Sequence, residues 1–119
     1  YAAASEIIAV DSSERALASA AHHAALNQLD NRVEWVQSDF FDYLSKGVDA
    51  GLKFDAIVLD PPRLASSRDN LERAMAAYHR LNYLAVRMLN PGGTLVTCSC
   101  SGRVSRTQFL EMLQGVSQR

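Results

Sequence analysis

Cysteine is scarce in this 119-residue chain, which holds only Cys98 and Cys100, two positions apart. A disulfide between such close neighbours has unfavourable geometry. No second Cys or His pair has the spacing of a zinc site, so we expect no metal. Two cysteines without a disulfide framework are typical of a reducing compartment, and we therefore predict a cytoplasmic protein.

Long apolar runs and a strong net charge are also missing. Without a run that could span a bilayer or a signal-peptide pattern, we expect no membrane partner. The formal net charge of −1 indicates no partner by itself. The halves differ, however: residues 1–60 hold 4 Lys and Arg against 10 Asp and Glu, whereas residues 61–119 hold 8 against 3. This asymmetry favours an anionic partner for the second half.

The chain has the length of one domain at most. It begins with Tyr1 rather than Met and soon enters a predicted strand, so we expect a piece of a longer protein. Apolar branched stretches predict strands, and they alternate with stretches of helical periodicity. Strands are expected at residues 6–11, 32–39, 54–60 and 94–100, and helices at residues 12–30, 40–51, 70–89 and 105–117. Ser12 or Ser13 is expected to cap the first helix and Ser105 the last. The helix at residues 70–89 is expected to end at "NPGG" and carries an apolar stripe at helical spacing, made of Leu71, Met75, Tyr78, Leu81, Ala85 and Met88.

This alternation predicts an α/β fold, with a mostly parallel sheet, helices on both of its faces and right-handed crossovers. In such sheets ligands bind beyond the carboxyl ends of the strands. Each predicted strand ends in a polar or reactive side chain, so we expect these side chains to share one cleft. They are Asp11, Asp39, Asp60 and the two cysteines.

The first two acids are candidates for binding a nucleotide-like cofactor. Asp11 is placed to accept hydrogen bonds from a ribose diol, as an acid does in nucleotide-binding sheets. Asp39 and Phe40 are placed to meet the amine and the edge of an adenine. The alternatives are a helix N-cap or a turn for each acid and core packing for Phe40.

The motif "DPPR", Asp60 to Arg63, directly follows the most apolar strand. Its two prolines make a stiff loop without backbone donors, which suits the wall of a flat substrate site. The alternative is a plain strand exit. We expect Pro61, Pro62 and Arg63 to contact the substrate.

The stretch "VTCSCSGR", residues 96–103, places both cysteines at the end of the last predicted strand. Residues i and i+2 of a strand face the same side, so both thiols would project together. Two interpretations stay open from this stretch alone. The thiols are buried and structural, which is common for free cysteine, or one is a nucleophile beside the cleft.

Together these stretches resemble the class I S-adenosylmethionine-dependent methyltransferases, and more narrowly the ribosomal-RNA cytosine-5 methyltransferases of the large-subunit I type. The resemblance runs from "IIAVDSSERALASA" to "FLEML" and is most specific where "FDAIVLDPPRLASSR" is combined with "NPGGTLVTCSCSG". In amino-group methyltransferases an aromatic residue usually follows Asp-Pro-Pro, whereas Arg63 and Leu64 follow here. The resemblance implies S-adenosylmethionine as cofactor, ribosomal RNA as substrate and a Rossmann-like core.

The resemblance also implies a covalent mechanism, in which a cysteine thiolate adds to carbon 6 of cytosine and activates carbon 5 for methylation. Cys100 matches the "S-C-S-G" position of the family and is the expected nucleophile. Cys98 is a second candidate. It lies further back in the predicted strand than Cys100, and a packing role is expected for it more often than a catalytic one. Asp60 is expected in both the catalytic and the cofactor-binding sets, where it holds the base or steers a proton.

Four arginines flank the two loops and are candidates for contacts with RNA phosphates. The alternative is a solvated basic surface. Three histidines lie within predicted helices and are expected to be solvated or partly packed. The arginines are Arg63, Arg68, Arg103 and Arg106, and the histidines are His22, His23 and His79.

The glycine-rich loop that follows the first strand of the resembled family is missing, because all six glycines lie elsewhere. We therefore expect residues 1–119 to form a partial domain that lacks the first strand and the closing hairpin. The strands at residues 6–11 and 54–60 must then pair directly, or something else must fill the gap. Exposed strand edges favour association, so we expect little cofactor affinity and a homodimer or an exchange of elements.

Other functions remain open. A methyltransferase that acts on guanine or on a small molecule would leave Cys100 inert. A non-catalytic RNA-binding scaffold would keep the sheet without the activity. A dinucleotide dehydrogenase fits least, because it explains neither "DPPR" nor "CSCSG".

Overall fold

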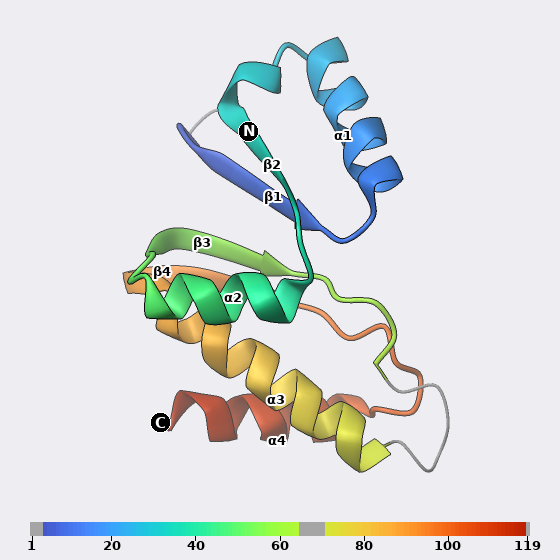
Figure 1. Cartoon of the computed structure of the whole chain (residues 1–119). Coiled ribbons are helices and arrows are strands. Elements are labelled where there is room, and N and C mark those ends of the chain that lie inside the picture. Colours follow the sequence, from blue (N-terminus) through green and yellow to red (C-terminus); the bar gives the residue numbers. More distant parts are fainter. Residues whose placement is uncertain (1–3, 65–70, 119) are drawn as a thin grey trace. The chain divides into compact units, whose positions relative to one another are not determined.

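The computed structural model describes residues 4–64 and 71–118 (Figure 1). Strands and helices alternate in the predicted order, which confirms the α/β class. The chain divides into two compact units, up to Tyr43 and from Leu44 onwards. The elements are β1 (Ile7–Asp11), α1 (Glu14–Leu26), a 3-10 helix η1 (Asp30–Arg32), β2 (Val33–Gln37), α2 (Phe40–Asp49), β3 (Phe54–Leu59), α3 (Leu71–Arg87), β4 (Leu89–Thr97) and α4 (Arg106–Ser117).

The first unit is a β-α-β arrangement built on a parallel strand pair. β1 pairs with β2 so that Ile7 lies opposite Val33 and Asp11 opposite Gln37. Helix α1 connects the two strands and begins where Ser13 Oγ accepts a hydrogen bond from the backbone N–H of Ala16 at 3.1 Å. This is the N-cap predicted from the sequence.

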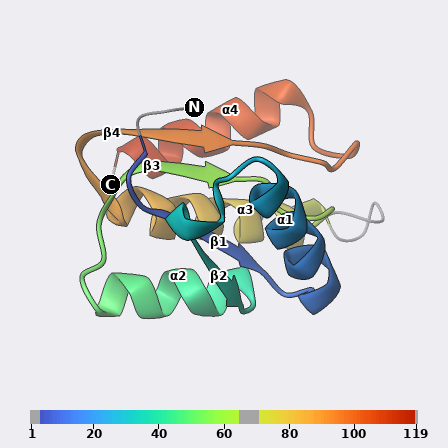
Figure 2. The same ribbon diagram turned by 90° about the horizontal axis from the view of Figure 1, so that it is seen from above.

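The second unit contains a second parallel pair, in which β3 and β4 run alongside each other in the same direction (Figure 2). Ala56 lies opposite Thr94 and Leu59 opposite Thr97. The prediction that β4 begins at Thr94 is wrong, because Leu89 already pairs with Phe54. Residues 90–93, "NPGG", form an irregularity within the strand rather than a stop before it.

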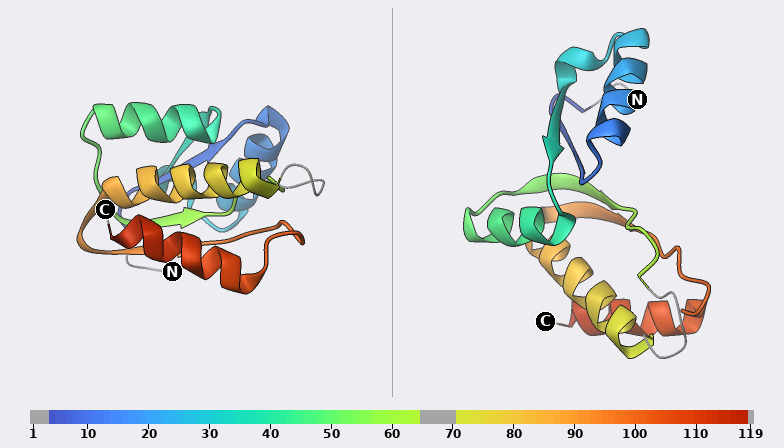
Figure 3. Two further views of the ribbon diagram at one scale, coloured as in Figure 1. Left: turned by 90° about the horizontal axis from the view of Figure 1, so that it is seen from below. Right: turned by 45° about the vertical axis from the view of Figure 1, so that its right-hand side comes forward.

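Helices α3 and α4 lie side by side and build the core of the second unit (Figure 3). The helical spacing predicted for α3 is confirmed, because Tyr78, Leu81 and Ala85 are at most 1% exposed. Helix α4 begins with a capping box between Ser105 and Gln108, as the N-cap prediction required. The buried cluster consists of Ala74, Tyr78, Val104, Met112 and Val116.

The strand pairs form two two-stranded sheets, β1–β2 and β3–β4. Within its own unit, each described strand has one hydrogen-bonded neighbour. No described helix has both the length and the apolar character needed to cross a membrane.

Candidate active site

The carboxyl ends of β3 and β4 carry the sharpest sequence motifs. The backbone N–H of Cys98 donates to the carbonyl of Leu59 at 2.9 Å, immediately after the last paired residue, Thr97. β3 ends at Leu59, and the chain continues through Asp60 into Pro61 and Pro62, which have no N–H to donate. The prediction that the strand runs through Cys100 is therefore wrong: both cysteines follow the strand, and alternation does not orient them.

The thiol of Cys100 contacts the carboxylate of Asp60, which directly follows β3. Its Sγ–H donates to Asp60 Oδ1 at 3.7 Å, and both residues are exposed. Cys98 is half-buried, and both cysteines are free. The structure thus brings together two of the predicted catalytic residues, and exposure distinguishes Cys100 from Cys98.

The "DPPR" loop and the cysteine loop are tied to each other. Ser101 Oγ accepts a hydrogen bond from the backbone N–H of Leu64 at 3.2 Å and lies 2.8 Å from the hydroxyl of Tyr78. Pro61 is buried, whereas Pro62 and Arg63 are exposed. Pro61 therefore anchors the loop by its burial, and Pro62 and Arg63 are exposed to solvent beside Asp60.

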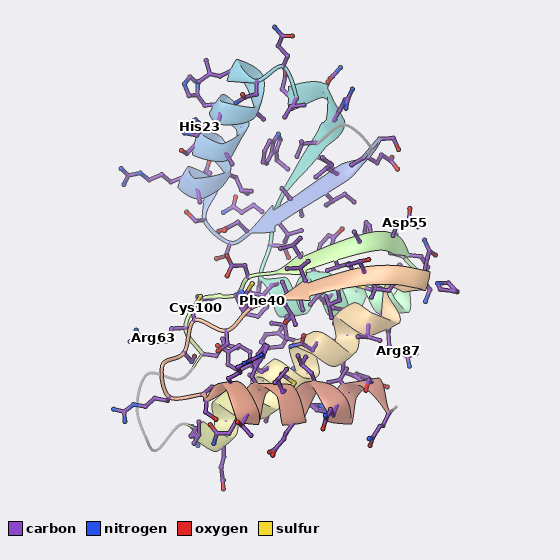
Figure 4. The ribbon with its side chains drawn as sticks, turned by 180° about the vertical axis from the view of Figure 1, so that it is seen from behind. His23, Phe40, Asp55, Arg63, Arg87 and Cys100 are labelled. Carbon is purple, nitrogen blue, oxygen red and sulfur yellow. The ribbon has the colours of Figure 1, made fainter. Side chains whose placement is uncertain are left out.

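The predicted phosphate-binding arginines are accessible where the structure describes them. Arg63, Arg103 and Arg106 are exposed. Arg63 and Cys100 lie at the same end of the second unit, opposite the end that carries Asp55 (Figure 4). Arg68 lies outside the described residues. Positive charge is thus available at the end of the second unit that carries Cys100.

Three of the four predicted cofactor residues, Asp11, Asp39 and Phe40, belong to the first unit and follow the strands β1 and β2, whereas Asp60 belongs to the second unit. The backbone N–H of Ser38 donates to the carbonyl of Asp11 at 3.1 Å, which brings the two strand ends together. Asp11 Oδ1 accepts from the N–H of Ser13 at 2.7 Å, and Asp39 Oδ2 accepts from the N–H of Asp42 at 3.1 Å. Both acids therefore act in a turn or helix cap, the alternative weighed from the sequence.

Each acid nevertheless keeps an oxygen for a ligand. Both side chains are exposed, and in the part of the chain that the structure describes Asp11 Oδ2 and Asp39 Oδ1 have no protein partner. Phe40 is half-buried, with its ring centroid 4.7 Å from that of Phe41. The packing expected as the alternative for Phe40 is present, and part of its ring remains accessible.

Two features were not predicted from the sequence. Burial, followed by the charge of Glu34, raises the pKa of Tyr43 above 10.0. Tyr78 was recognised only as a member of the apolar stripe of α3, whereas its hydroxyl also meets Ser99 and Ser101. Ser99 and Ser101, on either side of Cys100, were the sequence signal for this network, because a buried tyrosine hydroxyl needs hydrogen-bond partners.

Comparisons with known proteins show the family and the fold of this chain. The family described as "Methyltransferase domain" matches residues 1–118. The chain belongs to the methyltransferase-domain family. The class I methyltransferase resemblance and the fold class predicted from the sequence are therefore confirmed.

This methyltransferase-domain chain is similar to curated enzymes named "Ribosomal RNA large subunit methyltransferase I". The relative from Enterobacter sp. (strain 638) is 41% identical over 110 residues, which are 92% of this chain and 28% of the relative. The relative from Klebsiella pneumoniae (strain 342) is 40% identical over 109 residues, which are 91% and 27%. The chain thus spans less than a third of these relatives.

A solved structure has the same fold. The crystal structure of SMU.776, complexed with SAH, superposes with a TM-score of 0.78 at 24% sequence identity. The match covers 92% of this methyltransferase-domain chain and 29% of SMU.776.

Proposed function

We propose that this chain is part of one S-adenosylmethionine-dependent methyltransferase domain that methylates carbon 5 of cytosine in ribosomal RNA, with Cys100 as the nucleophile. The observation that carries the proposal is the 3.7 Å contact between the exposed thiol of Cys100 and Asp60 Oδ1. The names of the curated relatives support ribosomal RNA as the substrate.

The chemistry requires a thiol that gives up its proton beside the base. Addition of Cys100 Sγ to carbon 6 of cytosine turns carbon 5 into an enamine-like nucleophile. Asp60 already accepts the thiol hydrogen bond and is placed to receive that proton. When S-adenosylmethionine is bound, its sulfonium supplies the methyl group. Asp60, after passing the thiol proton to solvent, is placed to accept the carbon-5 proton. The electrons of that C–H bond then form the double bond between carbons 5 and 6, and the bond from Sγ to carbon 6 breaks to release the Cys100 thiolate.

The residues of the first unit fit the ribose and adenine of the cofactor. We assign Asp11 Oδ2 to the ribose hydroxyls, because that oxygen remains available while Oδ1 holds the turn at Ser13. Asp39 and the accessible part of Phe40 are assigned to the adenine, and Asp60 completes the cofactor set in the second unit. Carboxylates at the carboxyl ends of parallel strands are typical of such sites.

The substrate side is built from the "DPPR" loop and the basic residues. Pro62 is assigned to the wall of the base site, on a loop that the buried Pro61 stiffens. Arg63, Arg103 and Arg106 are assigned to RNA phosphates, because they are exposed. The two free cysteines fit a reducing compartment, and we assign the protein to the cytoplasm.

We expect this chain by itself to bind cofactor poorly and to self-associate. It has no glycine-rich loop to follow the first strand of the class I fold. Val58 and Val96 lie opposite each other in the β3–β4 register and are 68% and 50% exposed, which favours a homodimer. Titration calorimetry with S-adenosylmethionine tests the first expectation, and micromolar binding contradicts it. Light scattering at low and high concentration tests the second, and a strict monomer contradicts it.

A covalent adduct tests the proposed function. Residues 1–119 are placed in the Enterobacter relative, in exchange for its matching segment, and the chimera is incubated with S-adenosylmethionine and RNA that contains 5-fluorocytosine. Fluorine at carbon 5 blocks the elimination that frees the enzyme, so a stable protein–RNA complex is expected. The complex is lost in Cys100→Ala and kept in Cys98→Ala. Methyl transfer to RNA without an adduct favours the alternative in which Cys100 is inert.

A further inference from the structure

A buried hydroxyl contacts the loop that carries the exposed Cys100. Tyr78, on α3, is 0% exposed, and its hydroxyl lies 2.8 Å from Ser101 Oγ. The same hydroxyl accepts a hydrogen bond from Ser99 Oγ at 3.2 Å. Ser99 and Ser101, on either side of Cys100, therefore contact the same atom, the hydroxyl oxygen of Tyr78. That oxygen belongs to α3, which contributes no residue to the candidate site.

This network also reaches the loop that carries Asp60. Ser101, which is 4% exposed, accepts through Oγ from the backbone N–H of Leu64. Its own N–H donates to Ser99 Oγ at 3.3 Å. Hydrogen bonds that are shielded from water are stronger than exposed ones, and a connected network rigidifies what it joins. Cys100 and Asp60 thus lie on two loops that the hydrogen bonds of Ser101 and Tyr78 connect to each other.

Packing alone does not explain a tyrosine at this position. The ring of Tyr78 makes an edge-to-face contact with Phe109, with centroids 5.6 Å apart, and phenylalanine would provide the same contact. A buried tyrosine hydroxyl is costly unless it is hydrogen-bonded, so its value lies in the partners that it joins. Those partners are the two serines that flank Cys100.

We propose that Tyr78 is a positioning residue, whose hydroxyl holds Ser99 and Ser101 so that the Cys100 thiol faces Asp60. The catalytic meaning of this role rests on the proposed function, whereas the contact itself does not. Tyr78 acts through the loop and does not touch the thiol. Without the hydroxyl, the Ser99–Ser101 segment loses its common anchor, and Cys100 is no longer held against Asp60.

The test is a double-mutant cycle on thiol reactivity in the 119-residue chain. A Cys98→Ser background leaves Cys100 as the single thiol, and its alkylation rate by iodoacetamide is measured at fixed pH without denaturant. The effect of Asp60→Asn on this rate is compared with and without Tyr78→Phe. Tyr83→Phe is the matched control, because Tyr83 lies on the same helix and its hydroxyl accepts a hydrogen bond from the exposed Arg87 at 3.4 Å, away from the two serines.

We expect Asp60→Asn to change the alkylation rate several-fold in the background and in the Tyr83→Phe control. In the Tyr78→Phe variant, Asp60→Asn should change the logarithm of the alkylation rate by less than half as much, because the effects of substitutions at coupled residues do not add. Ser101→Ala, which removes the hydroxyl that Tyr78 meets, should reduce the effect of Asp60→Asn in the same way and covers the case in which Tyr78→Phe does not fold.

The proposal is overturned if Asp60→Asn changes the alkylation rate equally in every background. It is also overturned if Asp60→Asn has no effect on the rate in the Cys98→Ser background itself. A purely structural role of Tyr78 would lower the urea midpoint without changing this coupling. The assay uses neither RNA nor cofactor. If the chimera forms no adduct with 5-fluorocytosine RNA but Tyr78→Phe still reduces the effect of Asp60→Asn on alkylation, the proposed function is rejected and the positioning role is kept.

Discussion

RNA binding should depend on three exposed arginines beside the candidate site. Arg63 follows the two prolines, and Arg103 and Arg106 follow the cysteine loop. In the proposed function their guanidinium groups contact RNA phosphates. We predict that the triple substitution of these arginines with alanine weakens the binding of a single-stranded RNA oligomer and flattens its salt dependence.

The expected magnitude follows from counterion release. Each phosphate contact to a single strand contributes about 0.7 to the slope of log affinity against log salt concentration, so three lost contacts lower the slope by about 2. From about 50 to about 200 mM salt, a slope difference of about 2 means that the affinity of the parent chain falls about 20-fold further than that of the variant. Filter binding across a salt series measures both slopes.

A charge-matched variant serves as the control. Arg15, Arg32 and Arg87 are also exposed, and their triple substitution with alanine gives the same net charge. This control should retain the slope of the parent chain. If both triple variants lower the slope equally, bulk charge rather than a local phosphate site explains the binding. A slope unchanged by the first variant refutes the assignment.

Three further predictions concern stability. Gly47→Ala should destabilise the chain by about 1 kcal/mol or more, because the new Cβ would lie 2.5 Å from Met88 Cε and 3.1 Å from its Sδ. Met88 is 1% exposed and has little room to move aside, so overpacking outweighs the gain in helix propensity. Gly115→Ala, also within a helix but with no atom within 4 Å of the new Cβ, should instead stabilise by about 0.5–1 kcal/mol, and urea midpoints check both signs. Since burial and then Glu34 raise the pKa of Tyr43 above 10.0, its stabilising contribution is full below about pH 10 and is lost as the pH rises through the raised pKa. Tyr43→Phe should therefore show a smaller fall in urea midpoint above pH 10, and an identical fall contradicts this reasoning.

The sequence contains the signals that begin helices and bury their faces, and these predictions held. Ser13 and Ser105 cap helices as expected, because an N-cap depends on residues only three positions away. The apolar spacing of α3 identified its buried face, since one face of a helix is determined by local periodicity. Local interactions of this kind can be inferred without knowing the tertiary partners.

The ends of β4 could not be predicted in the same way, because a strand extends only as far as its partner. Leu89 belongs to β4 because Phe54 lies opposite, although "NPGG" follows it. Thr97 ends the strand because Pro61 follows soon after the end of β3 and cannot donate. The cysteines therefore lie in a loop, a position that depends on residues almost 40 positions earlier.

The candidate site was predicted by residue type but not by contact. The Cys100–Asp60 pair and the Tyr78 network join residues 40 and 21–23 positions apart, which no local pattern reveals. For Asp11 and Asp39 the sequence offered a cap or a ligand as alternatives. The structure shows the cap for one oxygen of each side chain and leaves the other oxygen available.

Mass spectrometry of the adduct formed by the chimera with 5-fluorocytosine RNA tests the central claim most directly. Digestion of the cross-linked complex should yield a single modified peptide, with the nucleotide attached to Cys100 Sγ. A nucleotide attached to Cys98, or methylated RNA with no attached peptide, would contradict the assignment of Cys100 as the nucleophile.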